Sequence, residues 1–225
     1  SAIYCFDAPY SISIIFNFVL FGQKSLNSLI MSLNLLEEFF PKEGVPFFRK
    51  WIEHHAIHFV VTRDRASKLG YYRKLPNGGH KITINATLSP DLFFFVLTHE
   101  LAHLIARETY GREILPHGSE WKHTYRNLLL ESISVYPKDL QPLIVQFSKA
   151  PKANFMASTD LVRYFFKDKL EKNEVFLCDL DIWHSFVYRK QEFKIFGRNK
   201  KTYLCKNLVN ERVYHFQPLA SVQKI

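Results

Sequence analysis

The segment from Ser89 to Gly111 constrains the fold of this chain more than any other part of it. Ser89-Pro90-Asp91 combines an N-cap residue, a proline at the first helical position and an acidic residue in the first turn, which is a typical helix start. Gly111 is a typical C-cap, so the helix is expected to end after Tyr110. The residues between these caps are apolar on nearly every side, which predicts a long helix buried in a domain core.

Polar residues interrupt this apolar helix in one place, His99-Glu100-Leu101-Ala102-His103. Helical residues four positions apart lie on the same face, so His99 and His103 can bind one metal ion. Burying two imidazoles and a carboxylate is costly unless they are paired, and a divalent cation pairs them well. The pattern is that of zinc hydrolases in which the glutamate is the general base. The alternative is a hydrogen-bonded pair of core histidines beside a surface glutamate.

Two histidines do not complete a catalytic zinc site, which normally has three protein ligands and a water molecule. Pro116-His117-Gly118-Ser119 predicts a turn that returns the chain to the helix, so His117 is the best candidate for the third ligand. The longer zincin pattern is absent, because Ala106 and Thr109 stand where it requires glycine and histidine. The donors that a different return path would favour are Glu108, Glu113, Glu120, His123 and Glu131.

Residues 98–122, which read THELAHLIARETYGREILPHGSEWK, resemble the core of the SprT-like metallopeptidases, the family that includes the protease Spartan. The shared features are the histidine-glutamate helix, a short variable loop and a His-Gly pair followed by an aromatic residue. The last of these features is His117-Gly118 and Trp121 in this chain. The resemblance covers about residues 31–145, and it implies hydrolysis of peptide bonds, with DNA-associated or DNA-crosslinked proteins as the substrate class.

The same resemblance implies that His99, His103 and His117 bind one zinc ion and that Glu100 is catalytic. Zinc lowers the pKa of a bound water toward neutrality and polarises the scissile carbonyl, while the glutamate accepts the proton and passes it to the leaving amine. A further donor would assist the oxyanion. The candidates for it are Tyr110, His123 and Tyr125, each of which packing or solvent exposure explains as well.

We predict an α+β fold with a zincin-like metallopeptidase core at residues 31–148, in which the active-site helix packs on a small mixed β-sheet between flanking helices. A hairpin signal, Pro76-Asn77-Gly78-Gly79, joins the last two strands. Either Tyr71 to Lys74 or Lys81 to Asn85 is expected to bind substrate by strand addition, unless the sheet only supports the helix. The predicted helices cover residues 33–40, 47–52 and 121–133, and a fourth starts at Ser158 or Thr159 and runs to the charged stretch at residues 167–172. The predicted strands cover residues 57–62, 69–74 and 80–85.

A helical connector at residues 149–173 and a small antiparallel β module at residues 174–225 are predicted to follow. The module's strands are expected at residues 175–177, 183–188, 193–196, 202–205 and 213–216, with Gly197-Arg198-Asn199 as a turn.

Many SprT-like proteins end in a zinc ribbon built on two CxxC pairs, and this chain departs from that pattern. Asp181 and Leu208 stand where Cys178 and Cys205 would need partner cysteines, so we predict that the module is metal-free. The alternative is a mixed site completed by His184 or His215.

The positive charge is concentrated in this module. Residues 1–148 carry 15 Lys and Arg against 13 Asp and Glu, whereas residues 149–225 carry 15 against 8. Basic residues at 189–190, 198 and 200–201 lie near Tyr188, Phe196 and Tyr203 in the sequence, a combination that can bind a nucleic acid backbone and stack its bases. DNA is therefore an expected partner, and a solvated basic face that promotes solubility is the alternative.

Length and composition favour a cytoplasmic protein with no membrane partner. The chain has 225 residues, 47% of them hydrophobic, and only three cysteines, which argues against a disulfide scaffold. No apolar run reaches the roughly 20 residues that span a bilayer. Residues 1–30 are predicted to be an N-terminal extension of uncertain status, since the resemblance begins near Met31. Within that extension Ile12 to Phe21 favours a buried strand or helix and lacks the features of a signal peptide.

Two functions from different classes remain open. The first is a zinc metallopeptidase whose substrates are proteins or peptides. The second is a nucleic-acid-binding or transcription-linked protein with a structural zinc site and no proteolytic activity. Glu100 favours the first function, because a structural site needs no carboxylate beside its metal.

Overall fold

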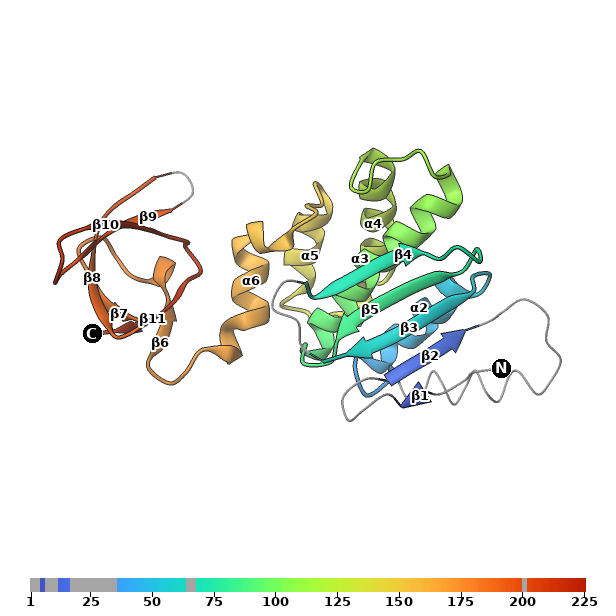
Figure 1. The fold of residues 1–225 in the computed structure, drawn as a ribbon, viewed down its shortest axis with the longest axis horizontal. Coiled ribbons are helices and arrows are strands. Elements are labelled where there is room, and N and C mark those ends of the chain that lie inside the picture. The colour runs from blue at the N-terminus through green and yellow to red at the C-terminus, as the bar shows by residue number, and fades with distance from the viewer. Residues whose placement is uncertain (1–4, 7–11, 17–35, 64–67, 200–201) are drawn as a thin grey trace. The chain divides into compact units, whose positions relative to one another are not determined.

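The chain divides into two compact units, Ser1–Ala153 and Asn154–Ile225. Helices and a mixed sheet make up the first unit, and an antiparallel sheet with a short helical segment makes up the second (Figure 1). The α+β class predicted from the sequence is therefore confirmed. The computed structural model describes residues 5–6, 12–16, 36–63, 68–199 and 202–225.

The sheet of the first unit has the strand order β1-β2-β3-β5-β4. β3 and β5 are parallel while every other neighbouring pair is antiparallel, so the sheet is mixed, as predicted. The predicted hairpin is also confirmed, because Gly78 adopts a φ of 82° and its N–H donates to Leu75 O. The strands are β1 (Cys5–Phe6), β2 (Ile12–Phe16), β3 (Ile57–Thr62), β4 (Gly70–Lys74) and β5 (His80–Asn85).

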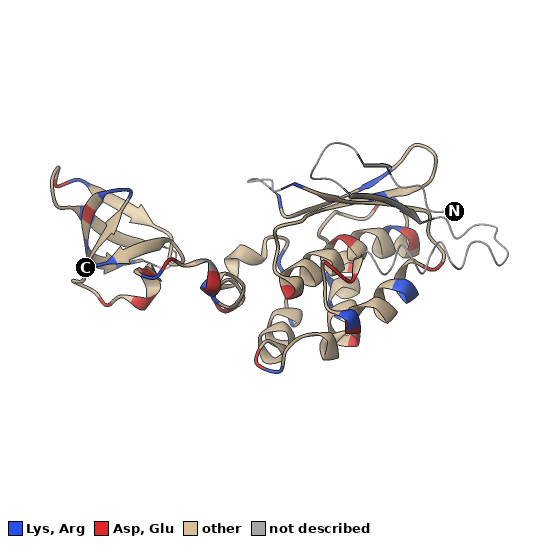
Figure 2. Ribbon diagram, turned by 90° about the horizontal axis from the view of Figure 1, so that it is seen from below, with Lys and Arg blue, Asp and Glu red and all other residues tan. Residues whose placement is uncertain are grey.

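Helices cover one face of this sheet, which Figure 2 shows edge-on. Of the helix predicted at residues 33–40, residues 33–35 lie outside the described part; Leu36 is helical and residues 37–39 form a turn. No helix in the described residues is long and apolar enough to cross a membrane. The helical segments are η2 (Lys42–Gly44), α2 (Val45–Ile52), α3 (Pro90–Tyr110), α4 (Ser119–Glu131), η3 (Ile133–Val135) and α5 (Gln141–Ser148).

Helix α3 lies at the centre of the first unit, and its residues 92–98 are all buried. Its three consecutive phenylalanines, residues 93–95, contact three different elements: Phe59 of β3, Trp51 of α2 and Tyr125 of α4. A helix that is apolar on nearly every side needs such partners all round it. The fold therefore supplies the buried environment that the sequence of this helix predicts.

The second unit contains a six-stranded antiparallel sheet with the order β10-β9-β8-β7-β11-β6. Its last strand in the chain, β11, was not predicted, because Ser221–Lys224 is short and mostly polar. The elements are η4 (Phe155–Ala157), α6 (Thr159–Phe166), η5 (Lys167–Lys169), β6 (Glu174–Phe176), η6 (Leu177–Asp179), β7 (Ser185–Tyr188), β8 (Gln191–Arg198), β9 (Tyr203–Asn207), β10 (Val213–Phe216) and β11.

The turn predicted at Gly197-Arg198-Asn199 is wrong, because β8 continues through Arg198. The register of β8 against β9 shifts between Ile195 and Gly197, so the glycine, which pairs with Leu204, adjoins an irregularity in the strand pairing. The chain reverses after this strand, where Asn199 Oδ1 accepts a hydrogen bond from the Thr202 N–H at 2.7 Å.

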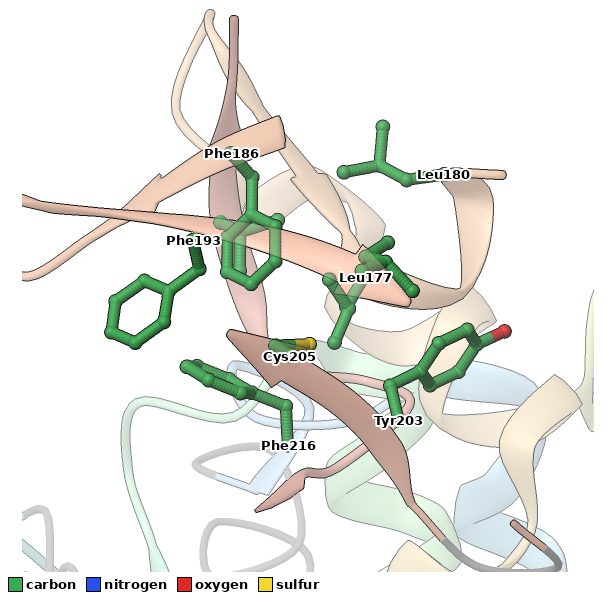
Figure 3. Packing of buried hydrophobic residues seen from close by; sticks show 9 residues of the cluster. Leu177, Leu180, Phe186, Phe193, Tyr203, Cys205 and Phe216 are labelled. Carbon is green, nitrogen blue, oxygen red and sulfur yellow. The ribbon is translucent and has the colours of Figure 1, made fainter. Parts of the chain in front are cut away.

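The second unit has its own apolar core (Figure 3). Phe186 of β7 is fully buried and lies 5.6 Å from Phe193 and 5.3 Å from Phe216, measured between ring centroids. Cys205 lies in the same core, where burial raises the pKa of its thiol to about 12. The thiol is therefore neutral near pH 7 and packs as a small apolar group.

We predict that Phe186→Ala destabilises the second unit, because it removes the ring that contacts both other phenylalanines. Truncation of a buried phenylalanine costs about 3–5 kcal/mol of unfolding free energy. Urea unfolding of the whole chain, followed by hydrogen exchange and mass spectrometry of peptides from residues 174–225, measures the change. Leu208→Ala is the control, since this side chain is 45% exposed and its loss is expected to cost under about 0.5 kcal/mol. Equal effects of the two substitutions would contradict the packing described above.

Candidate metal centre

The end of α3 and the start of α4 bring the candidate ligands together. α3 ends at Gly111, which adopts a φ of 89° and donates its N–H to Arg107 O at 2.9 Å. Glycine is suited to this left-handed conformation, which most residues avoid. The chain then turns back and starts α4 at Ser119, with Gly118 as its N-cap. This return places His117 next to the helix that carries His99 and His103.

The three histidines form a cluster that could hold a metal ion. One nitrogen from each ring lies within 4.8 Å of the other two. The ring centroids are 5.1 Å apart for His99 and His103, 5.5 Å for His99 and His117, and 4.7 Å for His103 and His117. The structure thus joins the predicted third donor to the two on the helix, and we call the group the three-histidine cluster.

The other donors that the sequence left open lie elsewhere. Glu108 accepts a hydrogen bond from Lys74, and Glu131 accepts hydrogen bonds from Lys50 and Trp51. Glu113 forms an ion pair with Arg112, and Glu120 and His123 are hydrogen-bonded to Ser119 and Asn127, respectively.

Trp121 of α4 contacts all three histidines of the cluster. Its ring lies 4.8 Å from His99, 5.3 Å from His103 and 4.6 Å from His117 between centroids, and it is fully buried. Such packing restricts the rotation of all three imidazoles. The Trp121 Nε1–H has no hydrogen-bond partner among the described residues, so it is a donor that a bound water or ligand would satisfy.

The environment keeps these imidazoles neutral. Burial, with smaller contributions from the neighbouring histidines, lowers the pKa of His99 to about 3. Burial also lowers the pKa of His103 to about 4 and shifts the pKa of His117 downward. Neutral imidazole is the form that binds metal ions. Three neutral nitrogen donors at these separations therefore fit a divalent transition metal.

Glu100 lies beside the cluster and is only 7% exposed. Its side chain packs against the backbone of β4 at Gly70. A Cβ atom at Gly70 would lie 2.6 Å from Glu100 Oε1 and 2.7 Å from Val96 Cγ1, closer than van der Waals contact allows. The glycine therefore provides the space that the Glu100 side chain occupies.

A cavity of about 500 Å³ opens onto these groups. All three histidines and Glu100 line it, and β4 contributes residues 70–74. Tyr72 of that strand lies parallel to the ring of His103, 6.0 Å away with an interplanar angle of 5°. Of the two predicted substrate-binding segments, the described lining includes Tyr71 to Lys74 and no residue of Lys81 to Asn85.

The sequence placed Trp121 in the shared motif and residues 71–74 at a substrate-binding edge, but it did not predict that Gly70 makes room for Glu100 or that Tyr72 and Trp121 pack on the imidazoles. The alternation of Gly70, Tyr72 and Lys74 along β4 was the available signal, because alternate residues of a strand share a face. The three residues considered as oxyanion donors, none of which was assigned that role, are absent from the described lining of the cavity. One of them, Tyr125, is fully buried and donates its hydroxyl to Phe95 O at 3.3 Å.

No family model, curated protein or solved structure matches this chain.

We predict that Gly70→Ala destabilises the first unit, because its methyl group would overlap both the Glu100 carboxylate and Val96. Overpacking of this kind costs about 1–3 kcal/mol. Chemical unfolding monitored by circular dichroism at 222 nm measures the free energy of unfolding. Gly197→Ala is the matched control, since the nearest atom to its added Cβ is 3.5 Å away. A smaller loss for Gly70→Ala than for Gly197→Ala would show that the contact between β4 and Glu100 is looser than described.

Proposed function

We propose that this chain is a zinc-dependent metallopeptidase of the SprT-like type, with Glu100 as its general base. The observation that carries the proposal is a buried carboxylate lying next to three neutral histidines at one cavity. The resemblance of residues 98–122 to the SprT-like core supports the same reading. Three protein ligands leave a coordination position for water or substrate, as catalytic zinc sites require.

His99, His103 and His117 would hold the zinc ion, which when bound polarises a carbonyl and lowers the pKa of water. Glu100 accepts the proton of the attacking water and delivers it to the nitrogen of the leaving amine. Its place beside Gly70 keeps the carboxylate next to the cavity.

A peptide is the substrate that the cavity wall favours. β4 is the last strand of its sheet on the side of the cavity, and its residues 70–74 line that cavity. The free edge of such a strand can pair with an extended peptide through backbone hydrogen bonds. This pairing would run a substrate backbone past the three-histidine cluster.

The decisive test of the enzyme is Glu100→Gln. Loss of the proton acceptor should lower the rate of peptide-bond cleavage by roughly 10²–10⁴-fold, the usual contribution of general acid-base catalysis. The content of bound zinc, measured by mass spectrometry of the metal, should not change, since the three histidines are intact. Glu113→Gln is the control, because its side chain is 88% exposed and pairs with Arg112. Equal rates of cleavage by Glu100→Gln and Glu113→Gln would show that Glu100 is not the general base.

A structural zinc site in a nucleic-acid-binding protein is less well supported as the whole function. Structural zinc sites are closed by four protein ligands. The three-histidine cluster instead lines a cavity that Glu100 shares.

We further propose that the second unit binds single-stranded DNA, which would bring the peptidase to DNA-associated proteins. Trp183 is 65% exposed and adopts a φ of 77°, a conformation that is unusual for a bulky residue and recurs at functional sites. Lys194 Nζ lies 6.0 Å from the centre of its ring. An exposed aromatic ring beside basic groups can stack a base while the cations contact phosphates. In Figure 2 the Lys and Arg positions, coloured blue, are spread over the ribbon of this unit.

We predict that Trp183→Ala weakens binding of a labelled oligothymidine, because stacking on an aromatic side chain contributes about 1–3 kcal/mol per base. The affinity should fall roughly 5- to 150-fold in fluorescence anisotropy at a fixed salt concentration. Ile182→Ala is the matched control, since the neighbouring side chain is 38% exposed and cannot stack a base. An unchanged affinity in Trp183→Ala would rule out this ring as the stacking surface.

A further inference from the structure

Tyr72, which packs on His103 of the three-histidine cluster, also contacts a second group of potential metal ligands through His80. His55, His80 and Glu108 each offer one ligand atom, and these atoms lie within 4.8 Å of one another. They come from three elements, because His55 follows α2, His80 begins β5 and Glu108 lies in the last turn of α3. We call this group the second donor cluster.

Backbone and ring contacts hold this cluster together. The His80 N–H donates to Ala56 O at 2.9 Å, which fixes the segment of His55 beside the start of β5. The two imidazole centroids are 5.6 Å apart. His80 Nε2 lies 3.6 Å from Glu108 Oε1. Two ligand atoms on a tetrahedral zinc ion, with bonds of about 2.0–2.1 Å, are about 3.4 Å apart. The distance between His80 Nε2 and Glu108 Oε1 is therefore close to the one that a shared ion requires.

The tautomer of His80 is set by its neighbours. Lys74 Nζ lies 3.1 Å from His80 Nε2, and an ammonium group can only donate, so Nε2 carries the lone pair. The proton is then on Nδ1, which donates to Tyr72 Oη at 3.1 Å. A metal-binding histidine has this same arrangement, with one nitrogen bare and the other N–H bonded to a fixed acceptor. Burial also lowers the pKa of His80 to about 4.

A cation already occupies part of this cluster. Lys74 Nζ donates to Glu108 Oε1 at 2.7 Å as well as to His80 Nε2. The ammonium group provides a partner for His80 and Glu108 but none for His55. Within the described part of the chain, the ring nitrogens of His55 have no hydrogen-bond partner, although the ring contacts His80. A metal ion would use all three donors at once.

We propose that His55, His80 and Glu108 form a second site for a divalent ion of the zinc class, in competition with the Lys74 ammonium group. The donor set of two imidazoles and one carboxylate is one that zinc commonly adopts. The site is independent of the proposed peptidase activity. An ion bound there would also restrict the position of Tyr72, which lines the cavity, because this ring contacts both His80 and His103.

Metal stoichiometry tests the site directly. The whole chain, stripped of metal, is titrated with zinc and with cobalt in a calorimeter, and bound cobalt is followed by its visible absorption. His55→Ala and Glu108→Gln should each bind one ion fewer than the wild-type protein. The matched controls are His54→Ala and Glu113→Gln, which change an adjacent histidine and an exposed glutamate outside the cluster.

Replacement of Lys74 by methionine keeps the aliphatic stem and removes the competing charge. Repulsion between unit charges about 3 Å apart in water corresponds to roughly a tenfold change in affinity, so Lys74→Met should bind the second ion at least about tenfold more tightly. Binding of an ion at the three-histidine cluster is expected to be unaffected by His55→Ala, both in the wild-type protein and in Lys74→Met.

The comparison of His55→Ala with His54→Ala decides the outcome. If both bind the same number of ions, in the wild-type and in the Lys74→Met background, the second site does not exist. A failure of the three-histidine cluster would instead remove one ion from every variant alike, so the two failures are distinguishable. Glu108→Gln repeats the test at an exposed position, where loss of the fold is not expected.

Discussion

The burial of α3 is the constraint on which the rest of the first unit depends. A helix that is apolar on nearly every side must be enclosed, and β3, α2 and α4 each cover one of its consecutive phenylalanines. The stretch next to β4 and the loop before α4 opens into a cavity. His99, Glu100 and His103 of the helix line this opening, where a bound ion can offset the cost of burying them.

The packing of β4 along α3 organises both donor clusters. Alternate residues of the strand face the helix, so Gly70 lies against Glu100, Tyr72 against His103 and Lys74 against Glu108. The three strand residues contribute differently. Gly70 leaves space for a carboxylate, Tyr72 offers an aromatic surface to an imidazole, and Lys74 pairs its charge with a second carboxylate. One strand thus arranges groups that are spread over nine residues of the helix.

Much of this architecture is encoded locally and could be predicted from the sequence. The caps at Ser89 and Gly111 fix the limits of α3, and the return at His117 follows from a turn signal before a helix start. Gly70 could not be recognised, since its importance arises from a contact with a residue 30 positions away. The prediction at Gly197 failed for a related reason: a glycine beside an irregularity in a strand and a glycine in a turn look alike until the partner strand is known.

The two donor clusters differ in what a divalent ion would do to the local charge. Glu108 is already paired with the Lys74 ammonium group, whose hydrogen bond is the main cause that lowers the pKa of that carboxyl. An ion entering there exchanges with a resident cation, so its net gain is one positive charge. The three-histidine cluster consists of neutral imidazoles, so an ion bound there adds its full charge beside Glu100. A full positive charge next to a carboxylate is what activation of water requires, whereas an exchange of cations suits a site that adjusts the cavity wall.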